Sequence, residues 1–298
     1  MSPGLARHSP WGLRTRLLAL ALLAAAALVR AQAQTPAPSA PGSAFMAALQ
    51  QVRLQGCDGR PGVDAPLAFE PRLARAAERA SRGTELTAAM SAEGYRVQRA
   101  RMFSLQGYSG AKALAQGLAR HACEALLDPA WRQVGLHQRG PAGWIILADP
   151  FSPPQPQDEA QIRSELHTRI NQARAQARRC GEQWFPSAAP LQLQARLHRV
   201  AQDHANDMAT HHYFSHTGRD GSQVGERARR AGYEWRTVGE NLAAGQPTAE
   251  GAVQGWLDSP GHCANLMRAS FTEMGLAFAV NLGSPSGIYW VQVLAAPR

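Results

Sequence analysis

The chain has 298 residues, 45% of them hydrophobic, and a formal net charge of +9 at pH 7. Lys112 is the only lysine, and the arginines that supply nearly all of the positive charge are scattered along the chain. No basic helix or aromatic platform accompanies them, so this pattern argues against a nucleic-acid partner.

The first 33 residues have the composition of an export signal. Three arginines precede the apolar run 17–29, and small residues at positions 31 and 33 form a cleavage motif. The thirteen apolar residues of this run are fewer than the roughly 20 that a membrane-spanning helix needs. We therefore expect a signal peptide over residues 1–33, cleaved after Ala33, and export to the periplasm or the medium. No transmembrane span is expected after cleavage.

Two segments of low hydrophobicity divide the rest of the chain. Residues 34–44 are mostly Ala, Pro, Ser and Gly, and residues 150–157 contain four prolines. Such compositions bury no core and are typical of linkers. We therefore predict one domain over residues 45–149 and a second over residues 158–298.

The two predicted domains share a series of motifs at similar spacings, which indicates a tandem repeat. Each contains, in the same order, a cysteine, a Pro-Leu pair, a Gly-Tyr pair, a second cysteine, a Gly-Leu pair and a final apolar strand. The matched motifs are Cys57 and Cys180, Pro66-Leu67 and Pro190-Leu191, Gly94-Tyr95 and Gly232-Tyr233, Cys123 and Cys263, Gly135-Leu136 and Gly275-Leu276, and residues 144–148 and 290–294.

The four cysteines are an even set in an exported chain, which predicts disulfides. Sequence alone allows three pairings. In a tandem repeat, the two cysteines of each copy are expected to pair with each other. We therefore expect one bridge between Cys57 and Cys123 and another between Cys180 and Cys263.

The first copy differs from the second at its polar positions. It has no acid at residues 102–104, which match the segment around Glu240, and it has Ala122 where the second copy has His262. We therefore expect the first copy to keep the fold of the second without a polar site.

Hydrophobic periodicity predicts helices over residues 158–178 and 191–212 of the second copy. Leucine, valine and methionine form an apolar stripe on the second of these helices, and its polar residues, His204 among them, are expected to lie largely off that stripe. The other predicted elements are a short helix over 224–231, a helix from Thr248 to Trp256, and strands over 274–280 and 288–294 joined as a hairpin. Helices together with an antiparallel hairpin indicate an α+β fold.

Three short polar motifs each present a residue suited to ligation or proton transfer: His216, Glu240 and His262. Glu240 stands between a glycine and an asparagine, which favours a turn or a helix start. Ser259-Pro260 has the form of an N-cap and first helical position, which places His262 in the first turn of a helix. His212 precedes His216 by four residues, the spacing of paired zinc ligands on a helix; capping of the helix end is the alternative.

Together these motifs resemble the CAP superfamily, also called the SCP domain, in its bacterial secreted form. The residues that carry the resemblance are Tyr213 to Gly218, Asp220-Gly221-Ser222, Gly239 to Ala243 and Trp256 to His262. The resemblance implies an α-β-α sandwich for residues 158–298. Through the repeat, it also implies a degenerate CAP-like copy for residues 45–149.

The resemblance implies a cleft that members of this family share. It is lined by two histidines and two acids, and in some members it holds a divalent metal such as Zn²⁺. By motif, the histidines correspond to His216 and His262, and one acid corresponds to Glu240. The fourth position falls on Ser259, with Asp258 beside it, where animal-type members have Glu. The resemblance thus implies a ligand or metal cleft with a changed fourth member.

Three hypotheses for function follow from this cleft. The first is a noncatalytic envelope or secreted module that binds a ligand, with or without a metal. The second is a metal-dependent hydrolase in which Glu240 acts as general base on bound water. The third is a structural or partner-binding body without a small-molecule site. We favour the first, because Ser259 lacks the setting of a hydrolase nucleophile and all cysteines are expected in disulfides. The ligand and the partner stay open.

Overall fold

The computed structural model describes residue 1 and residues 41–298. The predicted signal peptide, its cleavage site and most of the first linker lie outside the described residues. Among the helices of the described part, none is long and apolar enough to cross a membrane.

The first half of the chain forms a four-stranded sheet with the strand order β1-β3-β4-β2. Its elements are α1 (Pro41–Gln55), β1 (Ala68–Phe69), α2 (Pro71–Ser81), α3 (Leu86–Ala92), β2 (Val97–Leu105), α4 (Ala111–Leu126), β3 (Gln133–Arg139) and β4 (Ala142–Pro150). The first helix begins at Pro41, so residues 41–44 of the predicted linker belong to a helix.

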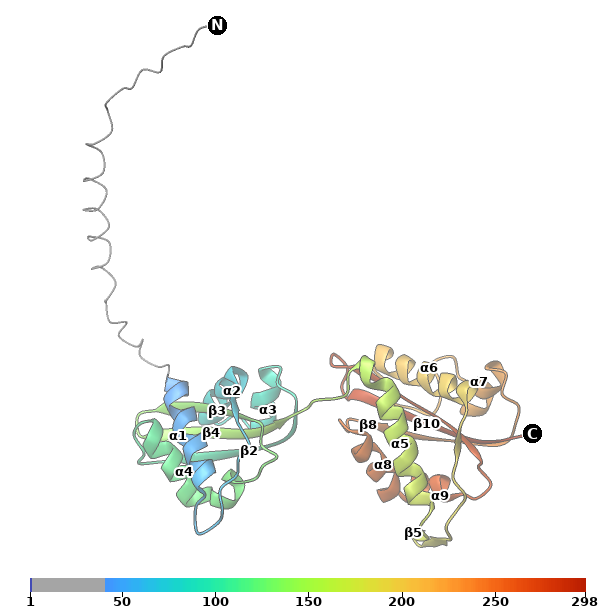
Figure 1. Cartoon of the computed structure of the whole chain (residues 1–298), viewed down its shortest axis with the longest axis horizontal. Helices are drawn as coiled ribbons and strands as arrows, with labels where there is room; N and C mark the ends of the chain where they lie inside the picture. Colours follow the sequence, from blue (N-terminus) through green and yellow to red (C-terminus); the bar gives the residue numbers. More distant parts are fainter. Residues whose placement is uncertain (2–40) are drawn as a thin grey trace. The chain divides into compact units, whose positions relative to one another are not determined.

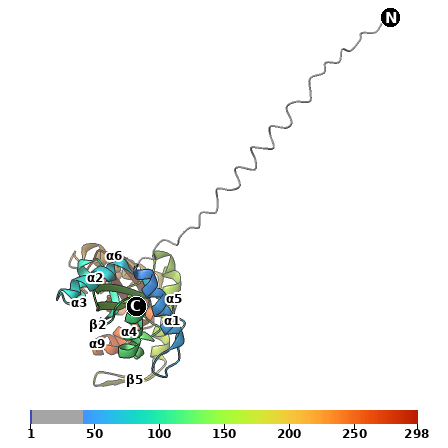
Figure 2. The same ribbon diagram turned by 90° about the vertical axis from the view of Figure 1, so that its left-hand side faces the viewer.

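The second half forms a four-stranded sheet with the order β7-β9-β10-β8 and a separate hairpin, β5-β6. Its elements are η1 (Pro156–Asp158), α5 (Glu159–Arg174), β5 (Arg178–Cys180), β6 (Gln183–Phe185), β7 (Gln192–Leu193), α6 (Ala195–His211), α7 (Val224–Arg230), β8 (Trp235–Ala244), α8 (Ala249–Asp258), α9 (Pro260–Met267), β9 (Glu273–Asn281) and β10 (Gly287–Pro297). Figures 1 and 2 both show the β5-β6 hairpin extending away from this sheet.

Spatial proximity groups the described residues up to Phe69, with 104–129 and 138–143, into one compact unit, and the other residues into a second unit. All elements from α5 to β10 lie in the second unit. The domain boundaries at residues 149 and 158 stay a prediction.

The sheet of the second half is covered by helices on both faces (Figure 1). Alternate residues of β10 explain this arrangement, because successive side chains of a strand point to opposite faces. Trp290 joins a core with residues of α5, α8 and α9, whereas Tyr289 and Val291 join a core with residues of α6 and α7. The predicted α-β-α sandwich is confirmed.

Both predicted disulfides are present. Cys57 is bonded to Cys123 across 66 residues, and Cys180 to Cys263 across 83 residues. The second bridge joins the end of β5 to α9 and so attaches the helix that carries His262 to the hairpin.

Two predicted helix boundaries are wrong. The helix expected over residues 158–178 ends at Arg174, because Arg178 pairs with β6 as the first residue of strand β5. The helix expected from residue 191 begins at Ala195, because Gln192 and Leu193 pair with β9 as strand β7. The side chain of Gln194 accepts hydrogen bonds from the amides of Arg196 and Leu197 and so caps the helix start.

Each half contains a fully buried arginine near the end of its first helix, Arg53 in α1 and Arg174 in α5. Each guanidinium donates to the carbonyl that precedes the Pro-Leu pair and to the carbonyls three and five residues after the second cysteine. The acceptors are Ala65, Leu126 and Asp128 for the first arginine, and Ala189, Leu266 and Arg268 for the second. Burial lowers the pKa of Arg174 to about 10, so it stays charged at neutral pH.

A glycine of the second long strand, β3 or β9, also touches a helix in the same way in both halves. A Cβ on Gly135 would lie 2.3 Å from the carbonyl carbon of Leu73, and one on Gly275 would lie 2.0 Å from that of Leu197. Only glycine allows so close an approach. A tandem duplication would leave such shared contacts. The CAP-like origin of the first half stays a prediction.

Candidate functional site

Glu240 lies inside strand β8, opposite Val293 of β10. The expectation of a turn or a helix start was therefore wrong. The strand period places Glu240 on the same face as Leu242, which packs with α6 and α7. Asn241 points to the other face, where its amide donates to the carbonyl of His262 at 3.1 Å.

The carboxylate of Glu240 is buried and bound by side chains from two other segments. His216 Nδ1 lies 2.8 Å from Oε1, and Arg227 Nη2 donates to Oε2 at 2.6 Å. The Glu240 side chain is only 2% exposed. His204 Nε2 lies 4.0 Å from Oε1. The sequence-predicted pair of His216 and Glu240 is thus in direct contact.

Arg227 of α7 is a member of this cluster that the sequence analysis missed. Besides Glu240, its guanidinium donates to the carbonyl of Ser222 at 2.8 Å and to that of His216 at 3.1 Å. It therefore fixes the backbone of the loop that carries His216 as well as the carboxylate. Nothing in a single sequence distinguishes this arginine from Arg229 and Arg230 beside it.

His204 of α6 is 2% exposed, so its expected position off the buried stripe was wrong. Its spacing of four residues from both Val200 and Met208, which are buried, is the signal that could have placed it on the buried face. Nε2 lies 2.9 Å from the carbonyl of Ser215, and because a carbonyl only accepts, Nε2 carries the proton. Burial lowers the pKa of His204, which favours the neutral ring.

His216 presents its other ring nitrogen away from Glu240. Because a carboxylate oxygen accepts, Nδ1 of His216 is the donor, and in that tautomer the lone pair of the ring lies on Nε2. The His216 side chain is 54% exposed, so that lone pair is open to a ligand. The pair of His212 and His216 on one helical face does not form, because α6 ends at His211 and His212 adopts φ 58°.

His262 lies in the first turn of α9, as predicted from Ser259-Pro260. Its ring is half-buried. Burial is the larger cause that lowers the pKa of His262, and the charge of His216 lowers it further. Two consequences follow: His262 is neutral near neutral pH, and its ring is near enough to His216 for their charges to interact. The Cys180–Cys263 bridge and the Asn241 hydrogen bond both restrain the helix start.

Asp258 and Ser259, the predicted fourth members, lie where α8 meets α9. Asp258 is exposed and accepts a hydrogen bond from Gln254 of its own helix at 2.7 Å. Ser259 precedes α9 without a side-chain capping bond. In the described part of the chain, neither side chain has a hydrogen bond to the two histidines or to Glu240. Their membership of the site stays a prediction.

The donor atoms in this region can be compared with those that a metal requires. Within residues 41–298, His, Cys, Asp and Glu side chains form no group of three or more suited to a metal ion. Two imidazoles have the chemistry of individual metal ligands. His216 has its Nδ1 held by a carboxylate, as in many metal sites, and the lowered pKa of His262 keeps its ring nitrogen unprotonated. Any further ligands would come from water or from a bound molecule.

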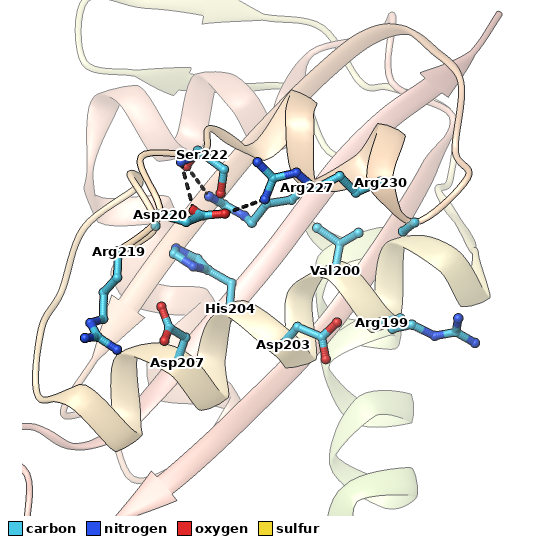
Figure 3. A pocket seen from close by; sticks show the side chains of 12 residues that line it. Arg199, Val200, Asp203, His204, Asp207, Arg219, Asp220, Ser222, Arg227 and Arg230 are labelled. Atoms are coloured by element: carbon cyan, nitrogen blue, oxygen red, sulfur yellow. Dashed lines mark hydrogen bonds and ion pairs between the residues drawn. The ribbon is translucent and has the colours of Figure 1, made fainter.

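A cavity of about 690 Å³ opens beside this cluster, between α6, the loop 218–222 and α7 (Figure 3). His204 and Arg227 line it, but His216, Glu240 and His262 do not. Arg227 therefore lies between the cavity and the carboxylate of Glu240.

Sequence comparison identifies the second half. The family model described as "CAP: Cysteine-rich secretory protein family" matches residues 167–294. This part of the chain is a CAP domain. The CAP domain contains both cysteines of the second disulfide, all strands of the second sheet except the end of β10, and the three residues His216, Glu240 and His262.

Individual relatives resemble the CAP domain over part of their length. The uncharacterized protein YkwD of Bacillus subtilis (strain 168) is 32% identical over 103 residues, which are 35% of this chain and 38% of that protein. The uncharacterized membrane protein YlbC of the same strain is 31% identical over 88 residues, 30% of this chain and 25% of that protein. The chain thus spans less than half the length of both.

A solved structure is also similar. An extracellular protein containing a SCP domain from Bacillus anthracis str. Ames is 21% identical, with a TM-score of 0.40 and 52% of each chain covered.

Proposed function

We propose that the CAP domain is a noncatalytic binding module of an exported protein, and that it binds its ligand through the imidazoles of His216 and His262. We call these two residues with Glu240 the imidazole site. In this proposal Glu240 orients His216 and takes no part in a reaction.

The carboxylate of Glu240 is the observation that carries the proposal. It is 2% exposed, and its two oxygens accept hydrogen bonds from His216 and Arg227. A general base has to reach the proton of the attacking water, either directly or through one further water. This carboxylate instead fixes the direction of an imidazole, as an orienting residue does. The hydrolase hypothesis therefore has less support than the binding hypothesis.

A divalent ion is compatible with this role. His216 and His262 would hold it, and the ion would supply a Lewis-acidic anchor for an anionic or carbonyl group of the ligand. The residues of the chain would set its position: Glu240 holds the His216 ring, and the Cys180–Cys263 bridge restrains His262.

Export is part of the proposal because of the cysteines. Two disulfides are typical of proteins that reside in oxidising compartments.

Zinc binding to untagged, chelator-free protein tests the imidazole site directly. We expect the protein to bind Zn²⁺ in calorimetric titration, and the variants His216→Ala and His262→Ala to lose this binding. His212→Asn is the matched control: it removes an exposed imidazole nearby, and asparagine tolerates the left-handed conformation at this position. No zinc binding by the unmodified protein, or equal binding by all variants, would overturn the proposal.

A further inference from the structure

The β5-β6 hairpin extends away from the sheet of the CAP domain (Figures 1 and 2) and exposes a tryptophan. Trp184 is 60% exposed, whereas Phe185 beside it packs against the core that contains Trp290. Successive side chains of a strand point to opposite faces, so the packing of Phe185 directs Trp184 outward. A large exposed ring with one polar atom is typical of a contact residue in a binding surface.

The hairpin that carries this ring is fixed to α9. Cys180 at the end of β5 is bonded to Cys263. In the turn, a Cβ on Gly181 would lie 3.1 Å from Cβ of Pro260, the first residue of α9. The chain therefore presents Trp184 from a restrained position, so that a partner would bind it with little loss of conformational entropy.

Arg179 is the cross-strand neighbour of Trp184, and both side chains lie on the same face of the hairpin. Nη2 of Arg179 donates to the carbonyl of Glu182 at 2.9 Å, which holds the guanidinium beside the turn. Among the residues that the structure describes, the Trp184 side chain has no hydrogen bond, ring contact or cation–π partner, and Arg179 forms no ion pair. We call Trp184 and Arg179 together the hairpin surface.

The size of this surface argues against a protein partner. A stable protein interface uses roughly 20–30 residues on each side, whereas β5 and β6 have three residues each.

The charges of the hairpin argue against an anionic lipid surface, which attracts clusters of about four to eight basic residues. The exposed Glu182 balances Arg179. Arg178 pairs with Phe185 on the opposite face and donates to the carbonyl of Ala173. The hairpin surface therefore favours an uncharged partner that one ring can hold.

We propose that the hairpin surface binds a neutral saccharide chain by stacking Trp184 on one of its rings. A pyranose ring has a face of C–H groups that packs on an indole ring, and its hydroxyl oxygens accept hydrogen bonds from the N–H groups of Arg179. This surface is a second binding site of the CAP domain, and it contains no residue of the imidazole site.

Titration with chitohexaose and, separately, with cellohexaose tests the proposal. These two chains share the same ring and linkage, but the first has acetamido groups where the second has hydroxyl groups. The measurement is the indole N–H NMR signals of the full mature chain, in which the signal of Trp184 is the one that Trp184→Phe lacks. We expect this signal to shift saturably with at least one chain, and that of the buried Trp290 to stay. A response to chitohexaose alone would show that the acetamido group is recognised, and a response to both that the shared ring is.

Variants of the hairpin separate stacking from hydrogen bonding, with the amide signals of β5 and β6 as the measure of affinity. Trp184→Ala should weaken binding about tenfold or more, and Trp184→Tyr should keep part of it, because a phenol ring still stacks. Arg179→Gln should weaken binding less than Trp184→Ala does. The matched control is Leu282→Ala, which removes a side chain of similar exposure, 56%, outside the hairpin and should bind as the unmodified protein does.

Three further results would overturn the proposal. The first is the absence of saturable shifts with both saccharides, or equal affinities of Trp184→Ala and Leu282→Ala. The second is binding to phosphatidylglycerol vesicles that Trp184→Ala abolishes, which would make the hairpin a membrane contact. The third is loss of saccharide binding in His216→Ala, which would assign the saccharide to the imidazole site; we expect binding to survive this change, whether or not the protein binds zinc.

Discussion

The hydrogen bonds of Glu240 tie three parts of the CAP domain to one carboxylate. His216 comes from the loop after α6, Arg227 from α7, and Glu240 itself from β8. The carboxylate and the guanidinium are both largely buried, with 2% and 11% of their side chains exposed. At such sites, removing one charge of a pair leaves the other buried without a partner.

This pairing predicts the effect of Glu240→Gln. The amide keeps the volume but removes the negative charge, and its NH₂ group would face a donor of His216 or Arg227. We expect the free energy of unfolding to fall by about 3 kcal/mol, measured by urea denaturation at pH 7.5. The control Glu234→Gln removes an exposed carboxylate and should cost less than about 0.5 kcal/mol. Similar costs for the two variants would show that the buried pair contributes little.

At the scale of the element, α6 buries His204 in the same stripe as Val200 and Met208. Burial lowers the pKa of His204, and the charge of Arg227 acts in the same direction. Glu240, the hydrogen bond with Ser215 and the charge of Asp207 act against this shift. The folded protein therefore holds His204 neutral at a pH where the unfolded chain, with a pKa of about 6.5, begins to bind a proton.

The free energy of unfolding should consequently depend on pH through the protonation of His204 in α6. The contribution of His204 is fully present above about pH 6.5 and is lost as the pH falls below it, at up to about 1.4 kcal/mol per pH unit. Urea denaturation at pH 7.5 and 5.5 measures this slope. We expect His204→Gln to reduce the slope, whatever its cost at pH 7.5, and the exposed His212→Asn to leave it unchanged. An unaltered slope in His204→Gln would mean that other groups cause the pH dependence.

At the scale of the whole molecule, the two disulfides close loops of similar length in the two halves, but only the second is attached to the imidazole site. In the chain-entropy model, either bridge contributes about 4 kcal/mol. Their structural surroundings differ, because Cys263 directly follows His262.

This difference predicts separable effects of two double variants of the full chain. Replacing Cys180 and Cys263 by alanine should lower stability and also weaken zinc binding, since the start of α9 loses its covalent restraint. Replacing Cys57 and Cys123 should lower stability by a similar amount and leave zinc binding unchanged. Calorimetric titration and thermal unfolding of both variants provide the measurements. Equal zinc affinities in the two variants would show that the Cys180–Cys263 bridge does not position His262.

The sequence by itself determined the features that short-range patterns encode. The motifs around His216 and His262 indicated the family, the order of repeated motifs indicated both disulfides, and two apolar runs indicated the strands β9 and β10. Such signals depend on the spacing of neighbouring residues, which the chain carries without its fold.

Only the tertiary structure decided how the site is built. Glu240 was expected in a turn because its neighbours favour turns, yet pairing with β10 holds it in a strand. His204 and Arg227 meet its carboxylate from 36 and 13 residues away in the sequence. No local pattern connects residues at those separations. Their contact arises because the packing of α6 and α7 on one face of the sheet buries a charge that then needs partners.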